Sequence, residues 1–167
     1  GGLCLRPAEL PALEQRLLRL LDDEQRAGAA PGATVPLVVA DNIGYMSAHE
    51  PRLRSGAGGA RAVWTGCAAG LEVVGITSDG RVRGCLSLPP ALDEGSLRER
   101  ALAHIWGDPA AFAYTRRFRV EQLAGACAGC ALGAVCRGGC TAMSMAASGA
   151  PHRYPCCLRR LAHGAAP

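Results

Sequence analysis

Nine cysteines constrain this chain of 167 residues more than any other feature. All but the first lie beyond residue 66, and four of them fall within fourteen residues, in the run Cys127-x2-Cys130-x5-Cys136-x3-Cys140. That run is rich in glycine and poor in large apolar residues, so burial alone is insufficient to hold it in one fold. We therefore expect its thiols to bind a metal centre that organises it.

Three chemistries compete for these cysteines. A disulfide framework needs an oxidising compartment, yet no export signal begins the chain, the cysteine total is odd, and two cysteines are adjacent. Structural zinc suits thiolates two residues apart. Iron–sulfur clusters use the same ligands over more varied spacings, and eight clustered cysteines provide about enough ligands for two cubanes. The cysteine spacing alone favours structural zinc and iron–sulfur clusters almost equally.

Charge and hydropathy argue against two kinds of partner. All 18 basic residues are arginines, and the formal net charge is only +4. The arginines are scattered among acids, and clusters such as Arg116–Arg119 are typical of solvated faces, so we expect no nucleic-acid partner. No apolar run approaches the roughly 18 residues of a membrane span, so we expect no membrane partner and a cytoplasmic protein.

The first part of the chain has the pattern of a helix followed by a buried strand. Leucines recur at helical spacing from Glu9 to Ala27, and Gly28 suits the end of that helix. Val35–Ala40 is a short apolar run, as expected of a parallel strand buried on both faces. The Gly- and Ala-rich stretch Ser55–Gly59 is interpreted as a linker.

The later part begins with a hairpin signal. Two runs rich in β-formers, Glu72–Thr77 and Arg81–Cys85, flank Ser78-Asp79-Gly80, and Asp-Gly between such runs favours a tight turn.

Three helices are expected to follow the hairpin. Ser96 and Glu99 have capping-box spacing, which predicts a helix over Leu97–Trp106. Asp108 and Pro109 resemble the start of another, reaching about Phe118, and a short helix is expected over Thr141–Ala147.

The wider cysteine pattern resembles one family. Cys67-x12-Gly80-x4-Cys85, the four-cysteine run and then Cys157 resemble the seven-cysteine signature of the SPASM domain of radical SAM enzymes, over roughly residues 67–160. The resemblance implies an α+β chain. Residues 1–58 would be the C-terminal remnant (helix plus strand) of a partial α/β barrel, and residues 59–167 a SPASM lobe with a β-hairpin, short helices and Cys-rich cluster-binding loops.

The resemblance also implies two auxiliary 4Fe-4S clusters. One would be held by Cys67, Cys85 and Cys140. The other would be held by Cys127, Cys130, Cys136 and Cys157, with Cys156 as a substitute for the last.

The first cluster has only three expected cysteine ligands, one fewer than its four iron atoms. Some family members supply a further cysteine before the first of the pair, and residues 59–66 contain none. The first cluster would keep an open iron site or take a distant ligand such as Asp, His or Cys4, and an incomplete or unbound cluster is the alternative. Cys4 otherwise suits a buried inert thiol, and the four histidines suit structural or surface positions.

The sequence contains no Cys-x3-Cys-x2-Cys motif, which in this family holds the cluster that cleaves S-adenosylmethionine. We expect the numbering to start inside a longer polypeptide, a radical SAM enzyme that carries S-adenosylmethionine and a third 4Fe-4S cluster. Asn42 and Tyr45 would approach the S-adenosylmethionine side of the barrel. The expected partners are the rest of the barrel and a peptide or protein substrate. The alternative is a non-catalytic iron–sulfur or zinc-binding module that interacts with peptides.

Overall fold

The computed structural model describes residues 5–27, 37, 39, 43–55 and 63–162. The chain divides into two compact units, one of Gly1–Thr65 with Pro155–Pro167 and one of Gly66–Tyr154. The expected boundary between residues 58 and 59, and all of the expected linker except Ser55, lie outside the described residues. Both therefore stay predictions. Within the described part of the chain, no helix is long and apolar enough to cross a bilayer.

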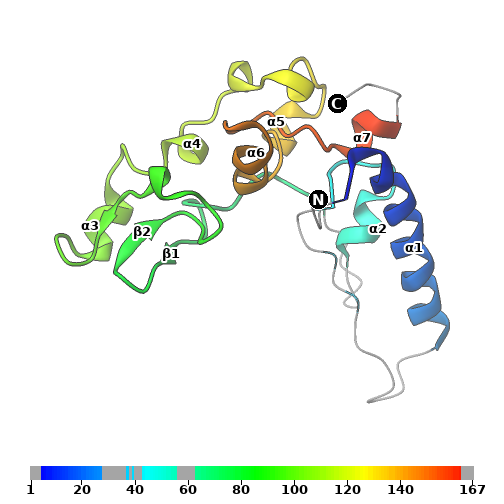
Figure 1. The fold of residues 1–167 in the computed structure, drawn as a ribbon, viewed down its shortest axis with the longest axis horizontal. Helices are drawn as coiled ribbons and strands as arrows, with labels where there is room; N and C mark the ends of the chain where they lie inside the picture. The colour runs from blue at the N-terminus through cyan, green and yellow to red at the C-terminus, as the bar shows by residue number, and fades with distance from the viewer. Residues whose placement is uncertain (1–4, 28–36, 38, 40–42, 56–62, 163–167) are drawn as a thin grey trace. The chain divides into compact units, whose positions relative to one another are not determined.

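The helix predicted over residues 9–27 is confirmed. A 3-10 turn, η1 (Pro7–Glu9), leads into α1 (Leu10–Ala27). Leu18 and Leu21 on its buried face pack against Leu53 of α2 (Glu50–Arg54). A third helix of this unit, α7 (Leu158–Ala162), also contacts α1 (Figure 1). The leucine stripe of α1 is therefore the apolar face around which the first unit assembles.

The strand expected over Val35–Ala40 is not established. Of that range the structure describes Leu37 and Val39, and neither lies in a strand. Both side chains pack against the core formed by α1 and α2. The other positions lie outside the described residues, so the remnant of a barrel stays a prediction.

A buried ion pair fixes α2 in the first unit. Glu50 Oε1 accepts hydrogen bonds from Arg54 Nε (3.0 Å) and from the Trp64 backbone N–H (3.1 Å), and Oε2 accepts one from Met46 N–H (3.0 Å). Arg54 Nη2 donates to the Gly44 carbonyl (3.0 Å). A buried charge is tolerated only when such bonds replace its water, and this carboxylate meets that condition.

The hairpin predicted in the second unit is confirmed. β1 (Gly75–Ile76) pairs antiparallel with β2 (Arg81–Arg83), with Gly75 opposite Arg83. Gly80 ends the turn with a φ of +86°, a left-handed conformation that glycine adopts without a Cβ clash. A third strand, β3 (Gly95–Ser96), pairs antiparallel with the other edge of β2. β2 is thus the central strand of a three-stranded sheet.

The helix predicted over Leu97–Trp106 starts later than expected. The structure has α3 at Leu102–Gly107. Ser96 is held in β3 opposite Arg81, and its Oγ accepts a hydrogen bond from the Arg98 N–H (3.2 Å) in a local turn. The capping-box prediction was wrong because strand pairing fixes the backbone of Ser96.

The prediction of a helix from Asp108 and Pro109 to about Phe118 is also wrong, because the observed helix is shorter. Only Ala113–Arg116 forms a helix, α4. Asp108 Oδ1 accepts a hydrogen bond from the Ala110 N–H (2.9 Å), which makes a turn. Phe112 then adopts a left-handed φ of +56°, which separates that turn from α4.

The core of the second unit explains the unusual backbone of Phe112. It comprises Val82, Ile105, Ala111 and Phe112, all at most 4% exposed. Burying a side chain of this size contributes about 1.5–3 kcal/mol, which offsets the roughly 1–2 kcal/mol of a left-handed residue. The Phe112 ring also packs against Gly70, where a Cβ would overlap it.

Arg116 ties this core to the start of the unit. Its Nε donates to the Gly70 carbonyl (2.7 Å) and its Nη1 to the Trp106 carbonyl (2.7 Å). The guanidinium lies 4.6 Å from the ring centroids of both Trp106 and Phe112. Arg116 is therefore a structural residue, and the interpretation of Arg116–Arg119 as a solvated face is wrong for its first member.

Short helices carry the Cys-rich segment. The helix predicted over residues 141–147 is confirmed as α6 (Thr141–Ser148). Ser144 Oγ, fully buried, donates to the Ala150 carbonyl (2.8 Å) and accepts from the Arg153 N–H (3.0 Å), which fastens the following loop to α6. The remaining short elements of the unit are η3 (Pro90–Leu92), η4 (Val120–Gln122), η5 (Gly125–Cys127) and α5 (Gly133–Cys136).

Replacing Arg116 by leucine tests its structural role. Arg116→Leu leaves the Gly70 and Trp106 carbonyls without their charged donor, so we expect the free energy of unfolding to fall by about 2–3 kcal/mol. Chemical denaturation of the variant measures this loss. Arg153→Leu is the control, because Arg153 is exposed and the structure gives its side chain no hydrogen bond. Equal losses in both variants would contradict the assignment.

Candidate functional site

The thiols of Cys67 and Cys140 meet although they lie far apart in the sequence. Cys67 is the second residue of the unit Gly66–Tyr154, and Cys140 immediately precedes α6. A hydrogen bond between the two thiols is the largest cause that lowers the pKa of Cys67 to about 5. Two of the three ligands expected for the first cluster are therefore in contact.

The start of α6 stabilises a thiolate at Cys67. The side chain and the backbone N–H of Thr141, together with the Ala69 N–H, also lower the pKa of Cys67, against the opposing effect of burial. Thr141 is the first residue of α6, where unsatisfied N–H groups and the helix dipole favour negative charge. Thiolates, not thiols, bind metals, so Cys67 has the protonation state a ligand needs.

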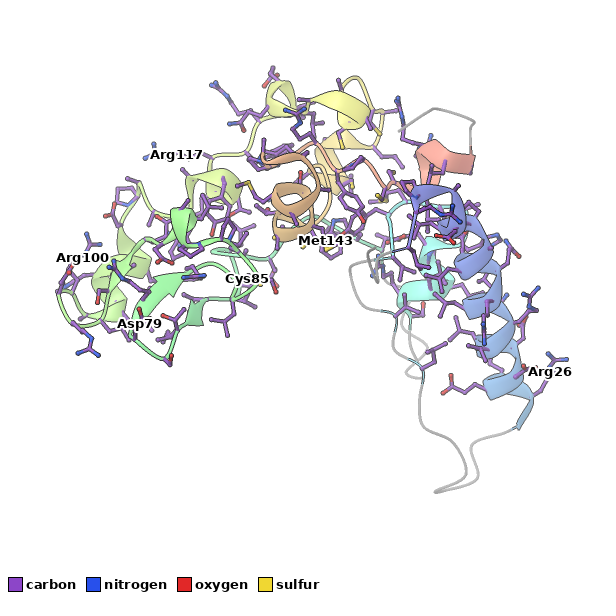
Figure 2. The ribbon with its side chains drawn as sticks, in the orientation of Figure 1. Arg26, Asp79, Cys85, Arg100, Arg117 and Met143 are labelled. Carbon is purple, nitrogen blue, oxygen red and sulfur yellow. The ribbon has the colours of Figure 1, made fainter. Side chains whose placement is uncertain are left out.

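Cys85 lies on the same side of the unit as Cys67. Both cysteines contribute electrostatically to raising the pKa of Tyr114, after the larger effects of burial and of Glu94. Tyr114 Oη accepts a hydrogen bond from the N–H of Gly84, the residue before Cys85 (3.2 Å). Figure 2 shows Cys85 at the end of the hairpin away from the turn that carries Asp79. The hairpin thus brings the third expected ligand toward Cys67.

Glycines let three chain segments approach closely around these cysteines. A Cβ on Gly84 would overlap the Tyr114 hydroxyl and come within 2.9 Å of the Gly70 nitrogen and 3.0 Å of the Ala69 carbonyl carbon. Thr115 Oγ1 donates to the Ala69 carbonyl (2.6 Å), which links α4 to the same place. The backbone beside Cys67 and Cys85 is therefore fixed by packing as well as by pairing.

Cys127, Cys130 and Cys136 occupy consecutive turns of a glycine-rich loop. The Cys130 N–H donates to the Cys127 carbonyl (3.2 Å), and the Cys130 carbonyl accepts from Gly133 (2.9 Å) at the start of α5, which ends at Cys136. The Cys127 thiol also donates to the Tyr154 carbonyl (3.8 Å). All three cysteines are half-buried. Local turns therefore determine the backbone path that connects these three cysteines.

Cys156 and Cys157 belong to the other compact unit. Both are half-buried, and the Cys157 thiol donates to the Tyr45 carbonyl (3.5 Å). The assignment of Cys157, with Cys156 as its substitute, to the second cluster stays a prediction. Cys4 lies outside the described residues.

The two residues expected near S-adenosylmethionine have different outcomes. Asn42 lies outside the described residues. Tyr45 is 1% exposed, and its ring packs on Trp64 with centroids 4.7 Å apart, while the Arg54 guanidinium lies 5.7 Å from its centroid. The structure gives Tyr45 a place in the core of its unit, and its expected role stays a prediction.

The described cysteines offer soft sulfur donors. No disulfide joins any of the eight. Among the described residues, no three His, Cys, Asp or Glu side chains converge closely enough to hold one metal ion. An iron–sulfur cluster makes a different demand, because each of its ligands binds a separate iron atom. The sulfur atoms of these cysteines, one of which is stabilised as a thiolate, are suitable donor atoms for the irons of such a cluster.

Three supporting residues were missed by sequence reasoning. Thr141 directly follows a predicted ligand at the start of a predicted helix, which was the available signal. Tyr114 is one of only three tyrosines in the chain, and Gly84 precedes a predicted ligand. Neither observation indicates that Tyr114 contacts Gly84, which is 30 residues away in the sequence. That contact forms only when the chain folds.

A comparison with family models adds independent evidence. Residues 67–131 match the SPASM family, described as an iron–sulfur cluster-binding domain. This match supports a SPASM-containing protein. The SPASM match includes Cys67, Cys85, Cys127 and Cys130, and ends before the other expected ligands. No curated protein and no solved structure matches the chain.

The close approach at Gly84 is testable by adding one methyl group. Gly84→Ala forces its Cβ into the Tyr114 hydroxyl and neighbouring backbone, so we expect a loss of about 1–3 kcal/mol in the free energy of unfolding. Gly107→Ala is the matched control, because a Cβ there meets nothing within 4 Å at the end of α3. Thermal or chemical denaturation measures both. A Gly84→Ala protein as stable as the parent would contradict the packing described.

Proposed function

We propose that the chain is the C-terminal region of a radical SAM enzyme that modifies a peptide or protein. In this proposal residues 59–167 are the SPASM lobe and residues 1–58 the end of the catalytic barrel. The observation that carries the proposal is the contact between the Cys67 and Cys140 thiols inside a unit whose residues 67–131 match SPASM. The two cysteines are brought together by the fold, as a shared cluster requires.

The proposed ligands form two sets. Cys67, Cys85 and Cys140 would hold one 4Fe-4S cluster, supported by the Cys67–Cys140 contact and by the position of Cys85 near Tyr114. The other set, supported for its first three members by the consecutive turns of their loop, is Cys127, Cys130, Cys136 and Cys157.

The protein's own groups would control the electrostatics of the first cluster. A bound 4Fe-4S cluster supplies an acceptor or donor of one electron. The N–H groups of Ala69 and Thr141, together with the Thr141 side chain, already bond to Cys67 and would hold its sulfur in a fixed orientation. Cys140, 8% exposed, would limit the access of water to the same side.

The catalytic step is proposed for a longer protein. Because the chain has no Cys-x3-Cys-x2-Cys motif, cleavage of S-adenosylmethionine would need a cluster bound elsewhere in that protein. Asn42 and Tyr45 are proposed to lie toward that cofactor. A peptide or protein substrate, the rest of the barrel and a cytoplasmic location are proposed on the family resemblance.

Metal analysis of the protein purified under anaerobic conditions tests this function. We expect about eight irons and an equal amount of sulfide per chain, as two cubane clusters require. A content of about two zinc ions per chain with little iron would contradict the proposal and support the alternative, a zinc-binding module. About four irons or fewer per chain would remove the two-cluster assignment.

Single-cysteine variants test the ligand assignment. Cys130→Ala should lose about half of the iron and lower the melting temperature, because metal binding contributes to the folding free energy of a core-poor segment. Cys157→Ala should lose the same share, and Cys156→Ala, its adjacent control, should keep full iron content. Full iron content in Cys130→Ala with unchanged melting would show the assignment to be wrong. Loss of iron in Cys156→Ala, with full iron content in Cys157→Ala, would show that Cys156 is the ligand instead of Cys157.

A further inference from the structure

One edge of the small sheet in the second unit is open. The strand order is β1-β2-β3, so β1 is an edge strand (Figure 1). The Thr77 N–H donates to the Arg81 carbonyl (2.9 Å), and Ile76 lies opposite Val82. Hydrogen-bonded and non-hydrogen-bonded pairs alternate along an antiparallel ladder, so the main-chain N–H and C=O of Ile76 point away from β2. Those of Val74, two residues earlier, do the same.

These outward groups have no partner in the described part of the chain. No backbone or side-chain hydrogen bond there reaches the N–H or C=O of Val74, and the only strand beside Ile76 is β2, from which its groups point away. Donors and acceptors two residues apart along an extended backbone are what a further strand pairs with. The open edge therefore has the hydrogen-bonding pattern that binds an extended polypeptide.

Exposed apolar side chains lie on both faces of this edge. Val73 is 49% exposed and Ile76 is 43% exposed. Leu86, 60% exposed, lies over Gly75, where a Cβ would overlap its side chain. Because successive side chains of a strand alternate between faces, Val73 and Leu86 lie on one face and Ile76 on the other. A strand added beside β1 would thus meet apolar groups on both of its own faces.

The sequence protects the other edge of the sheet and leaves this one unprotected. Exposed sheet edges are often blunted by charged side chains or proline, which prevent pairing with other chains. Residues 73–77 contain neither. β3, the opposite edge strand, is instead preceded by Glu94 and followed by the exposed residues Arg98, Glu99 and Arg100. An unprotected apolar edge in the same sheet indicates a surface that pairs with a partner.

The size of the edge favours a peptide over a second copy of the chain. A stable interface between two proteins uses about 20–30 residues a side. The open edge comprises residues 73–77 with Leu86, which is far fewer. An extended peptide needs only such an edge, since main-chain hydrogen bonds provide affinity and side-chain contacts provide specificity. The chemistry of the edge thus selects an extended segment with consecutive apolar residues.

We propose that β1 binds an extended, apolar segment of the substrate as a fourth strand of the sheet. The inference rests on the proposed function, in which the substrate is a peptide or protein. The segment pairs with the outward main-chain groups of Val74 and Ile76, and its side chains contact Val73, Ile76 and Leu86. The sheet thereby fixes the direction of the substrate chain, and the apolar contacts select its sequence.

Binding of a defined peptide to the anaerobically purified chain tests the proposal. The probe is a capped peptide of about seven residues, made of valine and threonine with a lysine at each end. We expect fluorescence anisotropy to show binding, and the bound peptide to slow hydrogen exchange in residues 73–77. The same peptide with N-methyl groups on alternate amides cannot donate to the edge, so it should bind about tenfold more weakly.

Two variants alter the edge while keeping the ladder to β2. Ile76→Pro removes an N–H that points away from β2, and proline is tolerated at such edge positions. Val73→Lys places a charge on the edge. Each should weaken binding of the probe peptide by about tenfold and keep the iron content of the parent. Val120→Lys is the matched control, because Val120 is 46% exposed but lies in η4, away from the edge. It should bind as the parent does.

The outcomes separate this inference from its rivals. No binding by the parent, or equal binding by the parent and both edge variants, would overturn it. Slow hydrogen exchange of residues 73–77 in the free chain would also overturn it, because another segment would then cover the edge. A dimer in sedimentation that Ile76→Pro abolishes would assign the edge to a second copy instead.

Iron content distinguishes failure of this inference from failure of the proposed function. A chain with about eight irons that does not bind the peptide would overturn the inference and leave the proposed function standing. A chain without iron that binds the peptide would overturn the proposed function, and with it the identification of the bound segment as substrate.

Discussion

The hydrogen bond between the Cys67 and Cys140 thiols is the constraint on which the second unit depends. It connects the beginning of the unit to the start of α6, and the thiolate that it favours at Cys67 faces the N–H groups of Ala69 and Thr141. A contact between residues so distant in sequence closes a long loop, whose entropic cost must be met by other interactions. The sheet, α3 and α4 lie within that loop, and their apolar packing meets part of this cost.

The two halves of that unit draw on different sources of stability. Around β2 and α3, Val82, Ile105 and Phe112 form an ordinary apolar core, at 0% exposure each. The Cys-rich half buries Leu123 and Tyr154 together with small or polar side chains such as Ala142, Ser144 and His152. The small or polar ones contribute less apolar area, and Ser144 and His152 are held by hydrogen bonds. Ligand binding by thiolates would add stability where burial gives least. The placement of Cys127, Cys130, Cys136 and Cys140 in this half is thus physically consistent with the proposed clusters.

Sequence patterns correctly predicted the features that depend on interactions between neighbouring residues. The leucine period of α1 and the Asp-Gly turn were sufficient because helix faces and tight turns depend on neighbouring residues. Ser96 and Asp108 carried equally good helix-start signals, yet pairing with β2 and the buried ring of Phe112 overrode them. For the site, the resemblance to SPASM domains implied that Cys67, Cys85 and Cys140 share a cluster, and that grouping stays a prediction; the residues that match SPASM include the first two of these cysteines. The contacts of Tyr114 and Arg116 arise from tertiary packing, so no local pattern indicated them.

Two residues near the cysteines adopt a left-handed backbone conformation. Arg137, next to Cys136, has a left-handed φ of +54°, and His152 has one of +59°, each at a cost of about 1–2 kcal/mol. His152 Nδ1 donates to the Arg137 carbonyl (2.9 Å), and its ring packs on Phe118 with centroids 4.9 Å apart. The Arg137 guanidinium lies 5.8 Å from the same ring. Because these interactions join protein groups only, they offset the strain in the polypeptide itself. Packing among His152, Phe118 and Arg137 therefore helps to hold the turn after Cys136.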